Sequence, residues 1–385
     1  MPSSVTGRRD VALVLSGGGM NGVLMQLGFL RQVRESAYWP RVGWIFGTSA
    51  GALSGALAAV DRLDDLEAFV LALQPEETFR PHRLWQIPLA GFHDYALPRT
   101  IDERLGDPVL LARQLALAPI ELVVVATDVT QDVDVRRLNV GELAYSAHEA
   151  TPEVFAQALL ASAAITVMPL RVADRVATDG GWVRHYPLGY AYDHPEVEMI
   201  IGFSFQLRLP PVGAGSVAHL RRRLERFRRV LPLRALISEL ARAEARASRG
   251  EPAHLGDMIL RLMRVSFLRN NALEERFADE KDQAIRELDT LRDDLLMLVR
   301  KHARGPRQRE RLARAVADRF AAARFPFRHD RYVPRITVRA GAGDVSLDHG
   351  FRRQQPWTEE AKRTLIRRGY DLAGRELDAY ERAVA

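Results

Sequence analysis

Three short glycine-rich stretches carry the residue types that could perform chemistry. Residues 47–51, GTSAG, have the G-x-S-x-G spacing in which a serine sits on a sharp strand-to-helix turn. Residues 179–181, DGG, offer a carboxylate beside glycines, so another loop can approach it closely. Residues 17–22, GGGMNG, can aim bare backbone N–H groups at an anion. The three together indicate a serine nucleophile with a carboxylate base and a loop that binds an anion.

The glycine loop (residues 17–22) has a second interpretation. Gly17, Gly19 and Gly22 also match the G-x-G-x-x-G fingerprint of dinucleotide-binding proteins. That fingerprint requires an acidic residue at the end of the second strand, to bind the ribose. The second predicted strand ends instead in Gly47-Thr48-Ser49. An NAD(P)-binding oxidoreductase is therefore the alternative, and a loop that binds an oxyanion is favoured.

A serine nucleophile needs a base, and histidine is the usual one. The chain has ten histidines, scattered outside any recognisable motif. Asp179 is the stronger candidate, because it follows a predicted strand and precedes two glycines. A carboxylate hydrogen-bonded to Ser49 could accept its proton directly. Taken alone, the stretch also fits an ordinary Asp-Gly turn.

The elements that must position these residues alternate between strand and helix over about the first 205 residues. The predicted strands are Val11–Leu15, Val42–Phe46, Glu121–Thr127, Arg171–Ala177 and Val197–Phe205, and the predicted helices include 22–36, 49–60, 62–73, 107–117 and 152–163. This alternation predicts an α/β fold with a mostly parallel sheet covered by helices. We expect functional loops at the carboxyl ends of the strands.

The pattern changes near residue 213. Residues 217–323 read almost entirely as helix, a strand returns at Pro334–Arg339, and helices follow at about 358–383. We therefore predict a catalytic α/β core over 8–212, an arginine-rich helical insertion or cap over 213–328, and a returning strand with C-terminal helices over 329–385. Within the insertion, residues 219–246 predict an amphipathic helix that bends at Pro232. Residues 255–268 are more apolar and predict core packing or the lining of an acyl-binding cavity.

Composition narrows the class of protein. Hydrophobic residues make up 47% of the chain and charged residues 27%, which is typical of a globular protein. With no cysteine, the chain has no disulfide, thiolate zinc site or cysteine nucleophile. No apolar run reaches the ~18 residues of a membrane span, and no secretory signal is recognisable. We expect a cytoplasmic protein, or one peripheral at a membrane.

Positive charge is carried almost entirely by arginine. The net charge is +6, and lysine occurs only at positions 281, 301 and 362 among the 55 basic residues. Guanidinium favours phosphate partners, such as lipid head groups or nucleic acid. The codon bias of a GC-rich genome is the alternative explanation.

The three glycine-rich stretches, in this order, resemble the patatin-like phospholipase family of lipid acyl hydrolases. The resemblance covers roughly residues 10–205 and implies a three-layer α/β/α fold with a Ser–Asp dyad. It implies that Ser49 is the nucleophile, that Asp179 is the proton acceptor, and that the N–H groups of Gly17, Gly18 and Gly19 form the oxyanion hole. It implies neither a cofactor nor a metal. The supporting motif positions are Asn21, Gly22, Gly47, Gly51, Gly180 and Gly181.

Three positions depart from the family pattern. Asn21 stands where the family usually has Arg or Lys, His185 replaces the usual Asn, and Thr166 replaces a common Pro. None of these changes removes a catalytic group. Asn21 leaves the loop without a cationic contribution.

The resemblance implies hydrolysis of fatty-acyl esters of the phospholipase A or lysophospholipase type, through an acyl-enzyme intermediate. The expected partners are a lipid substrate and, transiently, a membrane surface contacted by arginine-rich helices; no nucleic-acid partner is expected. Besides the oxidoreductase, the alternative is a basic membrane- or nucleic-acid-binding module with vestigial hydrolase loops. Lipid class, regiospecificity, oligomeric state and the need for an activating partner are open from the sequence.

Overall fold

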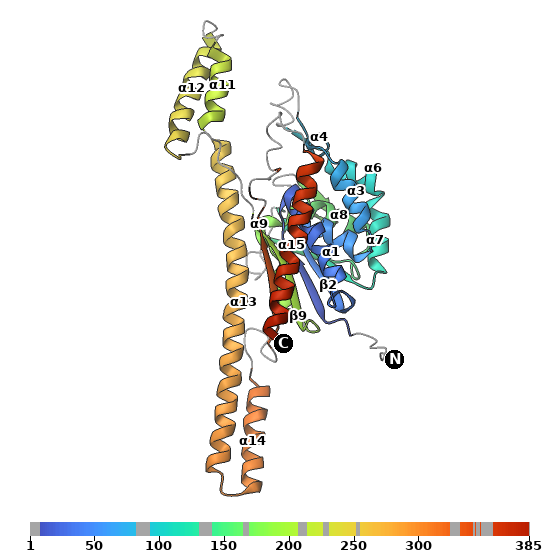
Figure 1. Cartoon of the computed structure of the whole chain (residues 1–385), viewed down its shortest axis with the longest axis vertical. Helices are drawn as coiled ribbons and strands as arrows, with labels where there is room; N and C mark the ends of the chain where they lie inside the picture. Colours follow the sequence, from blue (N-terminus) through green and yellow to red (C-terminus); the bar gives the residue numbers. More distant parts are fainter. Residues whose placement is uncertain are drawn as a thin grey trace.

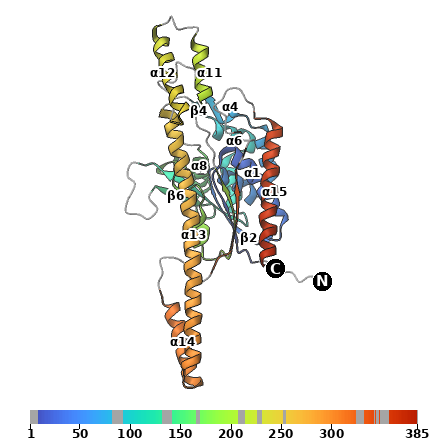
Figure 2. The same cartoon turned by 60° about the vertical axis from the view of Figure 1, so that its left-hand side comes forward.

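The fold comes from a computed structural model of the chain (Figure 1). It describes residues 8–81, 93–130, 141–164, 169–206, 214–225, 231–251, 255–323, 332–341, 343, 347 and 357–384. A central sheet lies between two layers of helices, and one long helix extends past the sheet at both ends (Figures 1 and 2).

The central sheet is mixed and mostly parallel. Its strand order is β10-β9-β1-β2-β5-β8-β7, and β6 also pairs with β5. The parallel strands are β1 (Val11–Leu15), β2 (Val42–Thr48), β5 (Glu121–Asp128), β9 (Met199–Phe205) and β10 (Arg335–Ala340). The antiparallel ones are β6 (Glu142–Ser146), β7 (Leu170–Val172) and β8 (Arg175–Asp179). Every residue of β1, β2 and β9 is buried, as expected for strands covered on both faces.

Alternate residues of β1 enter two separate cores, which define the layers. Val11, Leu13 and Leu15 pack in the larger core. Its helices are α1 (Gly19–Glu35), α2 (Ala50–Ala59), α3 (Leu63–Ala72), α6 (Leu97–Leu105), α7 (Pro108–Ala116), α8 (Pro152–Ser162) and α15 (Glu359–Val384). Ala12 and Val14 pack in a smaller core with α10 (Leu188–Asp193) and α13 (Leu255–His302). The predicted three-layer α/β/α fold is confirmed.

Short elements complete the α/β part. They are the 3-10 helix η1 (Trp39–Arg41), the helices α4 (Pro75–Thr78) and α9 (Gly181–Arg184), and the antiparallel pair of β3 (Phe79–Pro81) and β4 (His93–Tyr95). No helix in the described ranges is both long enough and apolar enough to cross a membrane.

The helices between β9 and β10 interrupt the sheet in sequence but not in space. They are α11 (Ala214–Glu225), α12 (Leu231–Ser248), α13 and α14 (Pro306–Ala321). β9 and β10 pair in parallel on either side of this insertion. We retain the division at 8–212, 213–328 and 329–385 as a proposal, because residues 207–213 and 324–331 lie outside the described residues.

Three local expectations were wrong. The run Arg171–Ala177 is not one strand: β7 and β8 form a hairpin, and Ala173 in its turn has a positive φ of 53°. The helix expected over 219–246 is two paired helices, α11 and α12, and Pro232 lies in the first turn of α12, where its missing N–H needs no partner. In the apolar stretch 255–268, Phe267 is buried whereas Met258, Leu262 and Val265 are exposed, so these three do not pack in the core.

The C-terminal helix α15 packs directly against α1. A Cβ on Gly28 would lie 1.9 Å from the carbonyl oxygen of Ile366, and one on Gly369 would lie 1.9 Å from that of Met25. The buried Lys362 donates hydrogen bonds from Nζ to the carbonyl oxygens of Leu71 and Leu73, where α3 ends. The last helix is therefore part of the core.

Candidate active site

Ser49 occupies the sharp turn between β2 and α2. Its backbone has φ 54° and ψ −118°, a conformation that residues other than glycine rarely adopt. A Cβ on Gly47 would lie 2.6 Å from the carbonyl oxygen of Gly51, and one on Gly51 would lie 2.2 Å from that of Leu15. Only glycine fits at these two positions. The G-x-S-x-G spacing therefore corresponds to a tight strand-to-helix turn.

Asp179 reaches the serine from an antiparallel strand. Thr48 of β2 lies opposite Val125 of β5, and Asp179 of β8 lies opposite Ala126 on the other side of β5. Ser49 and Asp179 are therefore level with each other across β5. Asp179 is the last residue of β8, so the acid stands at the carboxyl end of a strand as expected, and this strand is antiparallel to β5.

The two side chains are hydrogen-bonded and buried. Ser49 Oγ donates to Asp179 Oδ2 at 2.7 Å, and the N–H of Gly181 donates to Asp179 Oδ1 at 2.7 Å. Burial raises the pKa of Asp179 to about 6, while the bonds from Gly181 and Ser49 act in the opposite direction. A Cβ on Gly180 would lie 2.1 Å from the carbonyl oxygen of Val125, so this glycine allows the close approach to β5. At pH 7 Asp179 is mostly ionised and can accept a proton.

The glycine loop leads from β1 into the N-terminus of α1. Gly17 does not offer its N–H to a ligand, because that group donates to the carbonyl oxygen of His185 at 2.9 Å. The structure corrects the expectation for Gly17 in this respect. The N–H groups of Gly18 and Gly19 have no hydrogen-bond acceptor among the described residues. Gly19 also has a positive φ of 56°.

Two helices begin at the site. α1 starts at Gly19 and α2 starts at Ala50, directly after Ser49. A Cβ on Gly22 would lie 3.4 Å from the Cβ of Ala50, so the first turns of the two helices lie against each other. The N-terminal end of a helix carries partial positive charge and unpaired N–H groups. The arrangement favours negative charge beside Ser49.

Asn21 is not directed at a ligand. Its side chain is fully buried, and Oδ1 accepts a hydrogen bond from the N–H of Leu347 at 2.8 Å. The carbonyl oxygen of Leu347 in turn accepts from Trp357 Nε1 at 2.8 Å. The residue that replaces the family's usual cation therefore connects α1 to the segment before α15. Thr166 lies outside the described residues.

The backbone of Ser49 is held by Ser162, which the sequence did not single out. The N–H of Ser49 donates to Ser162 Oγ at 2.9 Å, and Ser162 Oγ donates to the carbonyl oxygen of Val125 at 2.6 Å. Ser162 is the last residue of α8 and is fully buried. Its only sequence signal was its place in an Ala- and Ser-rich stretch, which does not reveal a partner 113 residues away.

His185 lies beside the site but is not arranged as a histidine base. Its Nδ1 is 3.0 Å from Asn271 Oδ1 on α13, and its ring stacks on Phe267. Burial lowers the pKa of His185 to about 4, so the imidazole is neutral at pH 7. A Cβ on Gly17 would lie 3.0 Å from this ring, so glycine is needed there for the ring to fit.

The helix α13 holds the segment 181–189, which follows Asp179. Glu274 Oε1 accepts from Arg184 Nη1 at 2.7 Å, and Glu274 Oε2 accepts from the N–H of Gly189 at 2.9 Å. Asn270 Nδ2 donates to the carbonyl oxygen of Trp182 at 2.9 Å. Part of the insertion therefore packs directly on the backbone next to Asp179.

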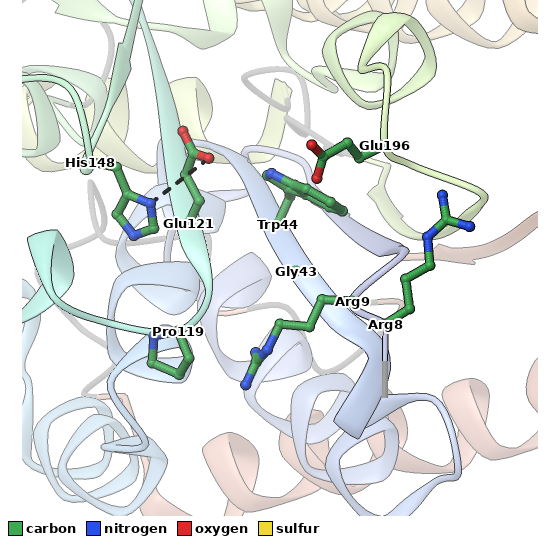
Figure 3. A pocket seen from close by; sticks show the side chains of 8 residues that line it. All are labelled: Arg8, Arg9, Gly43, Trp44, Pro119, Glu121, His148 and Glu196. Carbon is green, nitrogen blue, oxygen red and sulfur yellow. Dashed lines mark ion pairs between the residues drawn. The ribbon is translucent and has the colours of Figure 1, made fainter. Parts of the chain in front are cut away.

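A separate pocket lies at the opposite edge of the sheet. It has a volume of about 670 Å³ and is lined by Arg8, Arg9, Gly43, Trp44, Pro119, Glu121, His148 and Glu196 (Figure 3). Gly43 and Trp44 are near the start of β2, whereas Ser49 follows its end. At about 3.3 Å per strand residue, this places the pocket some 15–20 Å from the serine. No group of three or more metal-ligating side chains occurs in the described part of the chain.

A family model matches the part of the chain that contains the three glycine-rich stretches. Residues 13–192 match the family model of patatin-like phospholipases. The match confirms the predicted resemblance. Among solved structures, the chain is similar to the crystal structure of VipD from Legionella pneumophila, with 14% sequence identity and a TM-score of 0.40 over 97% of this chain and 67% of that one. No curated protein matches the chain.

Proposed function

We propose that the protein hydrolyses fatty-acyl esters of lipids with a Ser49–Asp179 dyad. The family match over residues 13–192 supports lipid acyl hydrolase activity in general. The observation that carries the dyad is the 2.7 Å hydrogen bond from Ser49 Oγ to the buried Asp179. A serine hydroxyl that donates directly to a carboxylate with a raised pKa needs no intervening histidine.

In the proposed acylation step, Ser49 Oγ attacks the carbonyl carbon of the ester, and its proton passes to Asp179 Oδ2. The negative charge on the carbonyl oxygen is stabilised by the N–H groups of Gly18 and Gly19 and by the N-terminal end of α1. Asp179 then returns the proton to the leaving alcohol oxygen as the C–O bond breaks. The product is an acyl-enzyme on Ser49.

Deacylation repeats this sequence with water. Water attacks the acyl carbon, Asp179 accepts the water proton, and the proton returns to Ser49 Oγ when the acyl–oxygen bond breaks. Gly18 and Gly19 stabilise the second oxyanion in the same way. The strained turn at Ser49 supports this proposal, because backbone strain is concentrated at functional positions.

The proposed substrates are phospholipids or lysophospholipids, which implies phospholipase A or lysophospholipase activity. A further part of the proposal is transient contact between the arginine-rich helices and a membrane, by a protein otherwise free in the cytoplasm. The described helices bear exposed arginines, such as Arg222 on α11 and Arg234 on α12, which suit phosphate head groups.

The test is hydrolysis of a soluble short-chain fatty-acyl ester and labelling with a fluorophosphonate probe. We expect Ser49→Ala to lower the rate by at least ~10³-fold and to abolish labelling, because the nucleophile is lost. Asp179→Asn should lower the rate by a similar factor while leaving Ser49 in place. Circular dichroism checks that both variants fold. Full activity of folded Ser49→Ala would disprove the proposed mechanism.

A further inference from the structure

The helix α13 runs across the sheet from the catalytic edge to the opposite edge. Phe267 and Asn271 contact His185 beside the dyad, whereas Asp279 pairs with Arg335, the first residue of β10. Because a helix rises 1.5 Å per residue, the residues before Phe267 extend beyond the edge where Ser49 lies. Figures 1 and 2 both show α13 continuing past this edge towards α11 and α12.

This projecting part of α13 carries an exposed apolar stripe. Met258, Leu262 and Val265 have exposed fractions of 41%, 59% and 61%. Their spacing of four and three residues places them on one face of the helix. Phe267 and Asn271, which contact the core, lie on the opposite face. The stripe therefore points away from the core at the catalytic end of the molecule.

The same region carries the excess positive charge of the protein. Residues 214–269 contain thirteen arginines, no lysine and five acidic residues. The rest of the chain has 42 basic and 44 acidic residues, so it is nearly neutral. Arg222, Arg234 and Arg269 are exposed and form no ion pair with any described residue. Exposed guanidinium groups suit an external anion such as a phosphate.

We propose that the stripe Met258–Leu262–Val265 and the arginines around it form a docking surface for an anionic phospholipid bilayer. The stripe would enter the bilayer where head groups meet acyl chains. The guanidinium groups would contact lipid phosphates, as in an interfacial helix. This inference rests on the proposed lipid hydrolase function and names the surface that delivers its substrate.

Charge and position favour a bilayer over other partners. Nucleic acid would satisfy the arginines but leaves a three-residue apolar stripe without a partner. A second copy of the chain would bring the same excess of positive charge against this one. Only an anionic lipid surface matches both the apolar stripe and the arginines. Docking here also places the bilayer at the edge of the sheet that holds Ser49.

The binding test uses the full chain with Ser49→Ala, so that lipid is not consumed, and vesicles of phosphatidylcholine with roughly one third phosphatidylglycerol. We expect Met258→Ser, Leu262→Ser and Val265→Ser together to weaken cosedimentation with these vesicles at least ~10-fold. The matched control is Leu291→Ser, Met297→Ser and Leu298→Ser, with exposed fractions of 51%, 59% and 52% on the same helix. This control lies about 50 Å along α13 from the stripe and should bind as the unchanged chain does.

A second arm tests the arginines. Arg222→Glu, Arg234→Glu and Arg269→Glu together should also weaken binding at least ~10-fold, and pure phosphatidylcholine vesicles should bind weakly from the start. The proposal would be overturned if the stripe variant and the arginine variant both bound the mixed vesicles as tightly as the chain that carries Ser49→Ala alone. So would a stripe variant that instead loses self-association in sedimentation velocity, or loses affinity for a DNA duplex with vesicle binding unchanged.

Activity separates this proposal from the proposed function. In the chain with Ser49 intact, we expect the stripe variant to lower the ratio of vesicle hydrolysis to short-ester hydrolysis by ~10-fold, whereas the control variant keeps the ratio. If the unchanged chain hydrolyses neither substrate but binds anionic vesicles through the stripe, the hydrolase proposal fails and the docking surface stands. If it hydrolyses both and the ratio does not change, the docking surface fails.

Discussion

Ser49 and Asp179 are each held in an environment that is unfavourable for the isolated residue. Ser49 has a positive φ of 54°, and Asp179 is a buried carboxyl group whose pKa is raised to about 6. Neither feature stabilises the fold, and both occur where the two side chains meet. This coincidence is expected of a site shaped for chemistry rather than for stability.

The raised pKa of Asp179 predicts the pH dependence of ester hydrolysis. Only the ionised carboxylate can accept the proton of Ser49, so kcat/KM should fall about tenfold per pH unit below about pH 6 and level off above pH 7. A pH profile on an uncharged ester measures this, with circular dichroism to verify folding at each pH. A midpoint near pH 4 would mean that Asp179 is not the proton acceptor in its buried state.

The sequence identified the residues whose role is visible in a short motif. The spacing around Ser49 and Asp179 is local, so both could be predicted as partners before any fold was known. The roles of Gly17, Asn21 and Ser162 could not, because each depends on a residue far away in the chain. Gly17 donates to the carbonyl oxygen of His185, Asn21 accepts from Leu347, and Ser162 accepts from Ser49.

At the scale of elements, apolar runs predicted the positions of strands well where the strands are buried on both faces. The strand Val11–Leu15 was predicted with its observed bounds, and β2, β5, β9 and β10 lie within two residues of theirs. The β7–β8 hairpin was missed because its turn, at Ala173, contains no glycine or proline signal. Helical periodicity in the insertion indicated an apolar helix face, but it could not predict what this face packs against.

The contact between α13 and the segment 181–189 makes an element-scale prediction. Glu274→Ala should lower the free energy of unfolding by about 1–3 kcal/mol, because it leaves the N–H of Gly189 without its acceptor and Arg184 with only its second partner, Glu142. Urea denaturation measures the change. The neighbouring Glu275→Ala is the control: Glu275 pairs with the exposed Arg339, so its loss should cost less than ~1 kcal/mol. Equal losses for both variants would contradict the role of Glu274 in holding the segment 181–189.

At the scale of the whole molecule, the first and last helices form one packing unit. α1 and α15 approach so closely that Gly28 and Gly369 leave no space for a Cβ atom. Lys362 adds a polar connection to the end of α3, and burial lowers its pKa to about 8. In the sequence, the insertion therefore lies between two segments that belong to a single core.

Lys362 tests this connection. Lys362→Met keeps the length of the side chain but leaves the carbonyl oxygens of Leu71 and Leu73 without this donor, so the free energy of unfolding should fall by about 1–3 kcal/mol. Lys301→Met, at an exposed position on α13, should change it by less than ~0.5 kcal/mol. Thermal unfolding of the two variants side by side gives the comparison. An unchanged midpoint for Lys362→Met would show that the two bonds add nothing to stability.

The pairing of β9 with β10 has a consequence for synthesis on the ribosome. Phe205 ends β9 and Arg335 begins β10, so about 130 residues are translated between them. At 5–20 residues per second, the free edge of β9 waits on the order of 10 s for its neighbour, and the glycine face of α1 waits longer for α15. Unpaired strand edges are where nascent chains associate wrongly. Translation of the insertion therefore delays completion of the core. During this delay the edge of β9 and the glycine face of α1 are both uncovered and open to a chaperone.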